Sequence, residues 1–76
     1  MKIFDTSLEG VKVVEPDVFS DNRGYFFESY HQGRYSENGI INTFVQDNES
    51  RSFRGVIRGL HYQLNPFAQA KLVRVV

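Results

Sequence analysis

The sequence contains no cysteine and no tryptophan among its 76 residues. Without cysteine it can form no disulfide, although domains below about 80 residues often depend on disulfides, a structural metal or oligomerisation for stability. A domain of this size buries only about 60% of the surface of its unfolded chain, so its core is expected to be marginal. The supports that remain are partner chains or further sequence.

The chain also lacks an excess of charge of either sign, because nine Lys and Arg residues balance nine Asp and Glu residues. No summed field would draw it to nucleic acid or to an anionic membrane surface, so neither is an expected partner. Apolar residues nowhere run long enough to span a bilayer, and residues 1–10 hold no signal-peptide core. These absences predict a soluble, cytoplasmic protein, and the lack of cysteine fits that location.

What the sequence does have is short runs of aromatic and β-branched residues separated by Gly, Pro, Asn, Asp and Ser. This punctuation is typical of strands joined by turns. The predicted strands cover residues 11–15, 25–30, 42–48 and 56–63, with a fifth starting near residue 71. Turns are predicted at the tetrad 21–24, before Val56 at Gly55, and through Asn65 and Pro66.

The chain is predicted to be a single incomplete domain covering residues 1–76. One short helical turn is expected over residues 32–38, ended by Gly39. The last residues, 72–76, are strand-forming and almost all apolar. A strand ending there would leave an unpaired apolar edge, which natural proteins avoid, so we expect a piece of a longer protein.

Polar residues on the predicted strands suggest a ligand site. On a strand period of two, Phe44, Gln46 and Asn48 share one face. Two amides on one face suit a polar ligand inside a barrel, since each offers a donor and an acceptor. The alternative is an ordinary solvated sheet face.

The predicted strand 56–63 holds a histidine that is either a hydrogen-bonded structural residue or a catalyst. Strict alternation separates Arg58 from His61, so Gly59 between them is expected to mark a bulge or bend if both meet one ligand. Metal-binding barrels of the cupin type usually carry a His-x-His pair at such a strand. Here Gln63 takes the second position, so no metal site is expected, and His31 is interpreted as a surface residue.

An aromatic run, Tyr25-Phe26-Phe27, lies in the predicted second strand. Alternate members of a strand face opposite sides. At least one ring is therefore expected to fill a core, while another is free to meet a ring-shaped ligand.

Four ordered stretches that span nearly the whole chain resemble the dTDP-4-dehydrorhamnose 3,5-epimerase family. They are Asp21-Asn22-Arg23-Gly24-Tyr25-Phe26-Phe27-Glu28, Phe44-Val45-Gln46-Asp47-Asn48, Arg58-Gly59-Leu60-His61-Tyr62-Gln63 and Ala68-Gln69-Ala70-Lys71-Leu72-Val73-Arg74-Val75. The resemblance implies an all-β fold, a cupin-like jelly-roll barrel, of which this chain is the N-terminal part.

The resemblance also implies a reaction. Members of the family invert C3 and C5 of dTDP-4-dehydro-6-deoxy-glucose, in dTDP-L-rhamnose biosynthesis, without a cofactor. Both carbons flank the C4 ketone, so a positioned base can remove each proton while the charge moves to the ketone oxygen. The resemblance assigns His61 as the base and Lys71 as the cation that stabilises the enolate and contacts the substrate.

The same resemblance assigns the substrate-binding residues, which are Arg23, Phe26, Glu28, Gln46, Asn48 and Arg58. Phe26 is expected near the thymine, and the arginines match the diphosphate through their fork geometry. The family implies a homodimer whose N-terminal strands are exchanged. It also implies that the proton-donating Tyr and the carboxylate that orients the histidine lie beyond Val76, so the 76 residues alone are expected to be inactive.

Three alternatives stay open. One is an epimerase of a related 4-keto nucleotide sugar that acts at a single carbon. Another is a non-catalytic, cupin-like module that binds a sugar nucleotide and needs Arg23 and Arg58 but not His61. The third is a structural fragment that folds only by assembling with itself or another chain.

Overall fold

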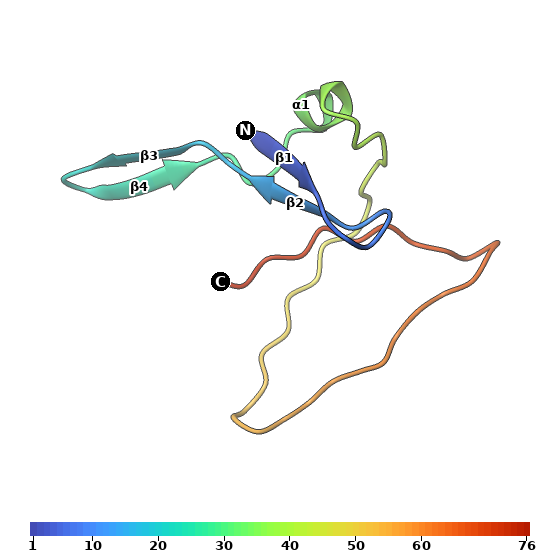
Figure 1. The fold of residues 1–76 in the computed structure, drawn as a ribbon. Coiled ribbons are helices and arrows are strands. Elements are labelled where there is room, and N and C mark those ends of the chain that lie inside the picture. Colours follow the sequence, from blue (N-terminus) through green and yellow to red (C-terminus); the bar gives the residue numbers. More distant parts are fainter. The chain divides into compact units, whose positions relative to one another are not determined.

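A computed structural model describes residues 1–76, and the chain divides into two compact units, Met1–Ile41 and Asn42–Val76. All the regular structure lies in the first unit and consists of four strands and one helix of six residues (Figure 1). The strands form two separate two-stranded antiparallel sheets. The regular structure is therefore mostly β, in agreement with the predicted all-β class.

The first hairpin joins β1 (Lys2–Asp5) to β2 (Lys12–Glu15) in antiparallel register. Asp5 and Lys12 are Cα partners at the loop end, and Lys12 Nζ donates to Asp5 Oδ1 at 2.5 Å. Opposite charges directly across a strand pair stabilise its register. β2 confirms the strand predicted over residues 11–15, whereas β1 was not predicted.

The second hairpin joins β3 (Val18–Asp21) to β4 (Gly24–Phe27) through a two-residue turn at Asn22 and Arg23. The turn was predicted from its composition and is confirmed. β4 is shorter than the predicted strand over residues 25–30, and β3 was missed. Alternation over four residues is a weak signal, and β1 and β3 were not predicted.

The helix α1 (Gln32–Glu37) begins after His31, whose backbone is extended. His31 Nδ1 accepts a hydrogen bond from the backbone N–H of Arg34 at 3.1 Å. The imidazole thus satisfies one of the N–H groups that a first helical turn leaves without a partner. The short helix predicted over residues 32–38 is confirmed, and His31 is exposed as predicted.

The end of α1 is closed by two reverse hydrogen bonds. The N–H of Gly39 donates to the carbonyl of Ser36 at 3.1 Å, and the N–H of Ile40 donates to the carbonyl of Tyr35 at 2.9 Å. This pair of bonds is the Schellman motif, which needs a residue with positive φ after the helix. Gly39, at φ +90°, supplies that conformation, and the predicted end of the helix at this residue is confirmed.

The hydrophobic core is almost absent, since Tyr35, 4% exposed, is the single buried apolar side chain. Its hydroxyl donates to the carbonyl of Ser29 at 2.8 Å, and its ring meets Tyr30 edge-on with 4.9 Å between centroids. Burial raises the pKa of Tyr35, with smaller contributions from Tyr30 and then from the Glu28 charge. The sheets have two strands each and no second layer, so the prediction of a marginal core is confirmed.

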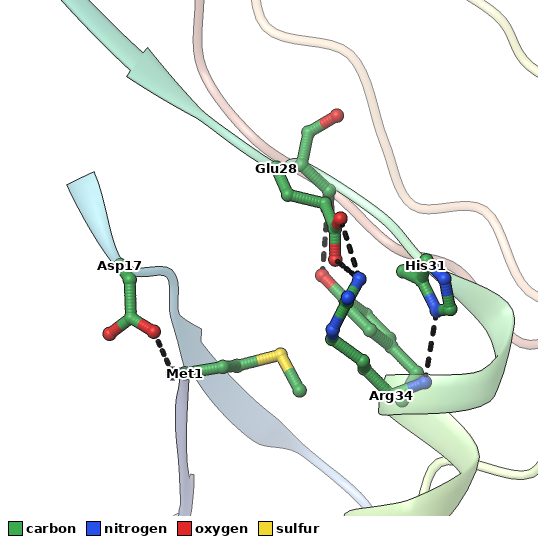
Figure 2. A network of polar contacts seen from close by, with 7 residues as sticks. Met1, Asp17, Glu28, His31 and Arg34 are labelled. Carbon is green, nitrogen blue, oxygen red and sulfur yellow. Dashed lines mark hydrogen bonds and ion pairs between the residues drawn. The ribbon is translucent and has the colours of Figure 1, made fainter. Parts of the chain in front are cut away.

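The start of β1 is tied down by an ion pair. The Met1 ammonium group donates to Asp17 Oδ2 at 2.7 Å (Figure 2). This hydrogen bond and the charge behind it lower the pKa of the Asp17 carboxyl, with a smaller contribution from Lys2.

In the second unit the strands predicted over residues 42–48, 56–63 and from 71 are wrong, because none of these stretches forms a hydrogen-bonded ladder. A strand exists only through pairing with a neighbour, and no two stretches of Asn42–Val76 pair with each other. The predicted turns are present, since Val56 N–H donates to the carbonyl of Phe53 at 3.1 Å and Phe67 N–H to that of Leu64 at 2.8 Å.

No helix in the structure combines the length and the apolar content needed to cross a membrane.

Candidate functional site

His61 and Lys71 line the same open hollow of about 360 Å³ in the second unit. The chain reverses between them at the turn where Phe67 N–H donates to the carbonyl of Leu64. This reversal brings the stretch that ends at Gln63 alongside the stretch that contains Lys71. The complete lining is Leu60, His61, Tyr62, Gln63, Gln69 and Lys71.

The lining of this hollow offers three kinds of polar chemistry. The imidazole of His61 is a side chain that can serve as a general base or acid. The ammonium of Lys71 can stabilise a developing oxyanion, and the amides of Gln63 and Gln69 each provide a donor and an acceptor. A base and a cation beside amides suit proton abstraction next to a carbonyl in a polar substrate.

A second hollow, of about 230 Å³, lies over the β3–β4 hairpin in the first unit. Phe19 and Phe26 are Cα partners in this hairpin and therefore project from the same face, where they are 65% and 70% exposed. Arg23 in the turn also lines the hollow. Exposed rings beside a cation suit a ligand that has a flat base and a negative charge.

Arg23 is held by Asp21, at the end of β3. Asp21 Oδ1 accepts from the backbone N–H of Arg23 at 2.8 Å, and Oδ2 accepts from its Nε at 3.1 Å and its Nη2 at 2.6 Å. The hydrogen bonds to Arg23 lower the pKa of the Asp21 carboxyl, and the side-chain bond raises the pKa of Arg23. The Arg23 side chain is still 86% exposed, so the guanidinium edge that faces away from Asp21 is open to an anion.

The rings of β4 alternate as predicted. Tyr25 and Phe27 stack on one face with 6.0 Å between centroids, while Phe26 faces the other way. Phe27 is half-buried and Phe26 is exposed. None of the three rings fills a closed core, so the expected core-filling role is not seen in these residues.

Glu28 follows β4, and its carboxylate is held by Arg34 of α1 (Figure 2). Arg34 Nη1 donates to both carboxylate oxygens at 2.8 Å. Arg34 was not singled out from the sequence. It lies six residues after Glu28, beyond the helical spacing at which ion pairs are usually sought.

The other predicted binding residues are not gathered around the His61 hollow. Gln46 and Asn48 are exposed in an irregular segment. Arg58 donates from Nε to the Ser52 hydroxyl at 2.7 Å and from Nη2 to the carbonyl of Arg51 at 3.1 Å. Arg58 therefore stabilises the loop in which it lies by binding residues six and seven positions before it.

Gly59, the predicted bend between Arg58 and His61, has φ +154°, which L side chains rarely adopt. On one side of Gly59, Arg58 is hydrogen-bonded within its own loop, and on the other side His61 lines the hollow. The two side chains thus have different surroundings, although residues 56–63 form no strand that would make them alternate.

Sequence reasoning also missed Phe19 and Gln69. Phe19 lies four residues before Arg23 in the unpredicted strand β3, and a search for a partner strand across the 21–24 turn would have found it. Gln69 lies in the stretch of family resemblance from Ala68 to Val75, in which only Lys71 was assigned a role. No group of three or more His, Cys, Asp or Glu side chains in the structure is arranged to hold a metal ion.

Comparison with known proteins places the chain in a family. The sequence model of dTDP-4-dehydrorhamnose 3,5-epimerase matches residues 5–76. A Pseudomonas aeruginosa protein with that name is 55% identical over 75 residues, covering 97% of this chain and 41% of the relative. A Methanothermobacter thermautotrophicus protein of the same name is 51% identical over 75 residues, covering 99% and 40%.

A more distant relative, from Streptomyces niveus, is named dTDP-4-dehydrorhamnose 3-epimerase and is 39% identical over 77 residues, covering all of this chain and 37% of the relative. The chain thus spans about two fifths of the length of these curated relatives. The family match extends over all but the first four residues and includes both hollows. The chain belongs to the dTDP-4-dehydrorhamnose 3,5-epimerase family.

Proposed function

We propose that the protein to which this chain belongs is a dTDP-4-dehydrorhamnose 3,5-epimerase that acts on dTDP-4-dehydro-6-deoxy-glucose. The observation that carries the proposal is the presence of His61 and Lys71 in one hollow. Relatives named for this activity, at about half identity over the whole chain, support it. Those relatives are longer, so the activity is proposed for the full-length gene product.

The reaction needs a base, an oxyanion partner and an acid. His61 removes the proton from C3 or C5, the C–H bond electrons form a C=C bond with C4, and the ketone oxygen becomes an enolate. Lys71 stabilises that oxygen, and its charge favours the transition state over the neutral ketone. An acid then returns a proton to the carbon from the opposite face, and the acid in this proposal is a Tyr that is not among these 76 residues.

The remaining assigned residues hold the substrate. Arg23 and Arg58 take the diphosphate, and Phe26 stacks on the thymine. Glu28, Gln46 and Asn48 complete the set with hydrogen bonds to the nucleotide and sugar. Support comes from the exposure of Arg23 and Phe26 around one hollow.

The proposed fold of the full-length protein is a jelly-roll barrel that forms a homodimer with exchanged N-terminal strands. The two hairpins each have two strands and expose much apolar surface, and such hairpins are marginal alone in water. Pairing with strands of a partner chain would stabilise the hairpins and bury part of the exposed apolar surface.

The test is solvent deuterium incorporation into C3 and C5 of the substrate by the full-length protein and its His61→Asn variant. We expect exchange at both carbons in the wild type and a loss of about 10²- to 10⁴-fold in the variant, with dTDP binding retained. Unchanged turnover in the variant would disprove the role of His61.

A single-carbon epimerase is the second candidate, favoured by the Streptomyces niveus relative, whose printed name is a 3-epimerase. The same experiment separates the candidates. Deuterium at C3 alone would replace the proposed function with this one. Tight dTDP binding without exchange at either carbon would instead indicate a binding module.

A further inference from the structure

The carboxylate of Glu28 is fixed by a neighbour that no family motif in the sequence includes. Arg34 Nη1 donates to Oε1 and Oε2 of Glu28, each at 2.8 Å (Figure 2). One donor nitrogen shared between both oxygens sets the direction in which the carboxylate faces. The Glu28 side chain is 45% exposed, so a ligand can still reach it.

Arg34 is itself held in place by α1. Its backbone N–H donates to His31 Nδ1 at the helix start, and its carbonyl accepts from Asn38 Nδ2 at 2.7 Å. The adjacent Tyr35 is buried and bonds back to the carbonyl of Ser29, which directly follows Glu28. Both members of the ion pair are therefore anchored to one local unit.

Two consequences follow for a ligand at Glu28. A carboxylate has about four lone-pair positions, and Arg34 uses two of them, which leaves acceptors for hydroxyl or N–H donors of a ligand. A bare carboxylate would also repel a substrate that carries a diphosphate, whereas the guanidinium offsets its charge.

We propose that Arg34 is a positioning residue for substrate binding: it acts through Glu28, whose carboxylate it orients and whose charge it offsets before an anionic nucleotide sugar. The inference rests on the proposed function, which gives Glu28 its substrate. It adds a residue that does not itself contact the substrate.

The test compares Arg34→Gln, Glu28→Gln and the double variant of the full-length protein, by KM and kcat for the substrate and by calorimetric Kd for dTDP. We expect Arg34→Gln to raise KM and Kd about two- to five-fold, the range for an exposed ion pair, with kcat unchanged. In the Glu28→Gln background, Arg34→Gln should change neither KM nor Kd further, because the carboxylate through which Arg34 acts has been removed. Arg34→Lys restores the charge and should recover part of the affinity.

These substitutions leave the helix propensity of α1 nearly unchanged, because Arg, Lys and Gln have similar values. The matched control is Lys12→Gln, which breaks the ion pair with Asp5 in the first hairpin and should leave KM and Kd unchanged.

Each contrary outcome has a distinct meaning. If Glu28→Gln raises KM and Arg34→Gln does not, the role of Arg34 is wrong and the proposed function stands. If the two changes add fully in the double variant, Arg34 does not act through Glu28. If the wild type neither exchanges substrate protons nor binds dTDP, the inference and the proposed function both fall.

Discussion

At the scale of single residues, each ion pair between two side chains joins residues that lie two to seven positions apart in the sequence. Arg23, assigned to the diphosphate, already shares its Nε and Nη2 with Asp21. A phosphate would therefore meet a guanidinium whose inner edge is occupied and whose outer edge is free. Asp21 thus fixes the direction from which an anion approaches Arg23.

The Asp21 carboxyl should titrate below its ordinary pKa because the Arg23 side chain, and then the Arg23 backbone, stabilise its charged form. A carboxyl with a lowered folded-state pKa favours the folded turn above the unfolded pKa, and this contribution is lost as the pH falls through the folded pKa. Carboxyl-carbon NMR titration of the full-length protein checks it. Arg23→Gln should move the Asp21 pKa upward, and Lys12→Gln should not; an unmoved pKa in the first variant would contradict the contact.

Lys71 offers a second residue-scale prediction. Lys71→Gln keeps a polar side chain but removes the charge that we propose stabilises the enolate, so we expect kcat to fall about 10²- to 10³-fold. Lys71→Arg should recover part of that loss. Steady-state kinetics of the full-length protein provide the measurement, and Lys12→Gln is the control. A change confined to KM would show that Lys71 only binds the substrate.

At the scale of elements, α1 is short, yet both of its ends are closed by specific contacts, at His31 and at Gly39. A helix of six residues is too short to be stable by propensity alone. Its caps and the buried Tyr35 must supply what its length does not. The contacts of Arg34 with Glu28 depend on this helix.

Gly39→Ala should destabilise the end of α1, because a side chain at φ +90° is strained even though no atom lies within 4 Å of the added Cβ. We expect a loss of about 1 kcal/mol in the free energy of unfolding of the full-length protein, measured in urea. Ser36→Ala, in the same helix with ordinary geometry, is the control and should change stability little. Equal stability of both variants would argue against the Schellman end.

Elements whose signals are local were predictable from the sequence, and elements that depend on distant partners were not. The turn at Asn22 and Arg23 and the end of α1 at Gly39 follow from residue types with fixed backbone preferences. The strands predicted over 42–48 and 56–63 have the right composition, but a ladder needs a neighbouring strand, which composition does not specify. The same distinction separates the site residues that were predicted from those that were missed.

Motif resemblance singled out His61 and Lys71, and the structure places both in one hollow, while their catalytic roles stay predictions. Arg34 carried no sequence signal, because its contact with Glu28 depends on how α1 follows β4. Phe19 was not singled out because the strand that contains it, β3, was not predicted.

At the scale of the whole molecule, exposed apolar surface is the dominant feature. Twenty-one large apolar or aromatic side chains are exposed, against one that is buried. The free energy available from burial is therefore small, and conformational entropy opposes folding. This balance bears on how residues 1–76 behave when they are produced by themselves.

Residues 1–76 expressed alone should show no cooperative thermal transition in near-ultraviolet circular dichroism and should bind a dye that reports exposed apolar surface. The full-length protein should show a sharp transition and bind little dye. A cooperative transition in the 76-residue polypeptide at low concentration would contradict the expectation. A transition that sharpens with concentration would point to self-assembly.

The closed end of α1 also bears on how the protein ages chemically. Asn38 precedes Gly39, and asparagine followed by glycine deamidates when the glycine nitrogen attacks the side-chain carbonyl carbon and ammonia leaves. Here the Gly39 N–H is bonded to Ser36 and the Asn38 amide is bonded to Arg34, so neither partner is free to react. Any change that opens this helix should therefore start a slow conversion of Asn38 to a succinimide, which water hydrolyses to aspartate or isoaspartate, whereas an intact helix end protects Asn38 from this reaction.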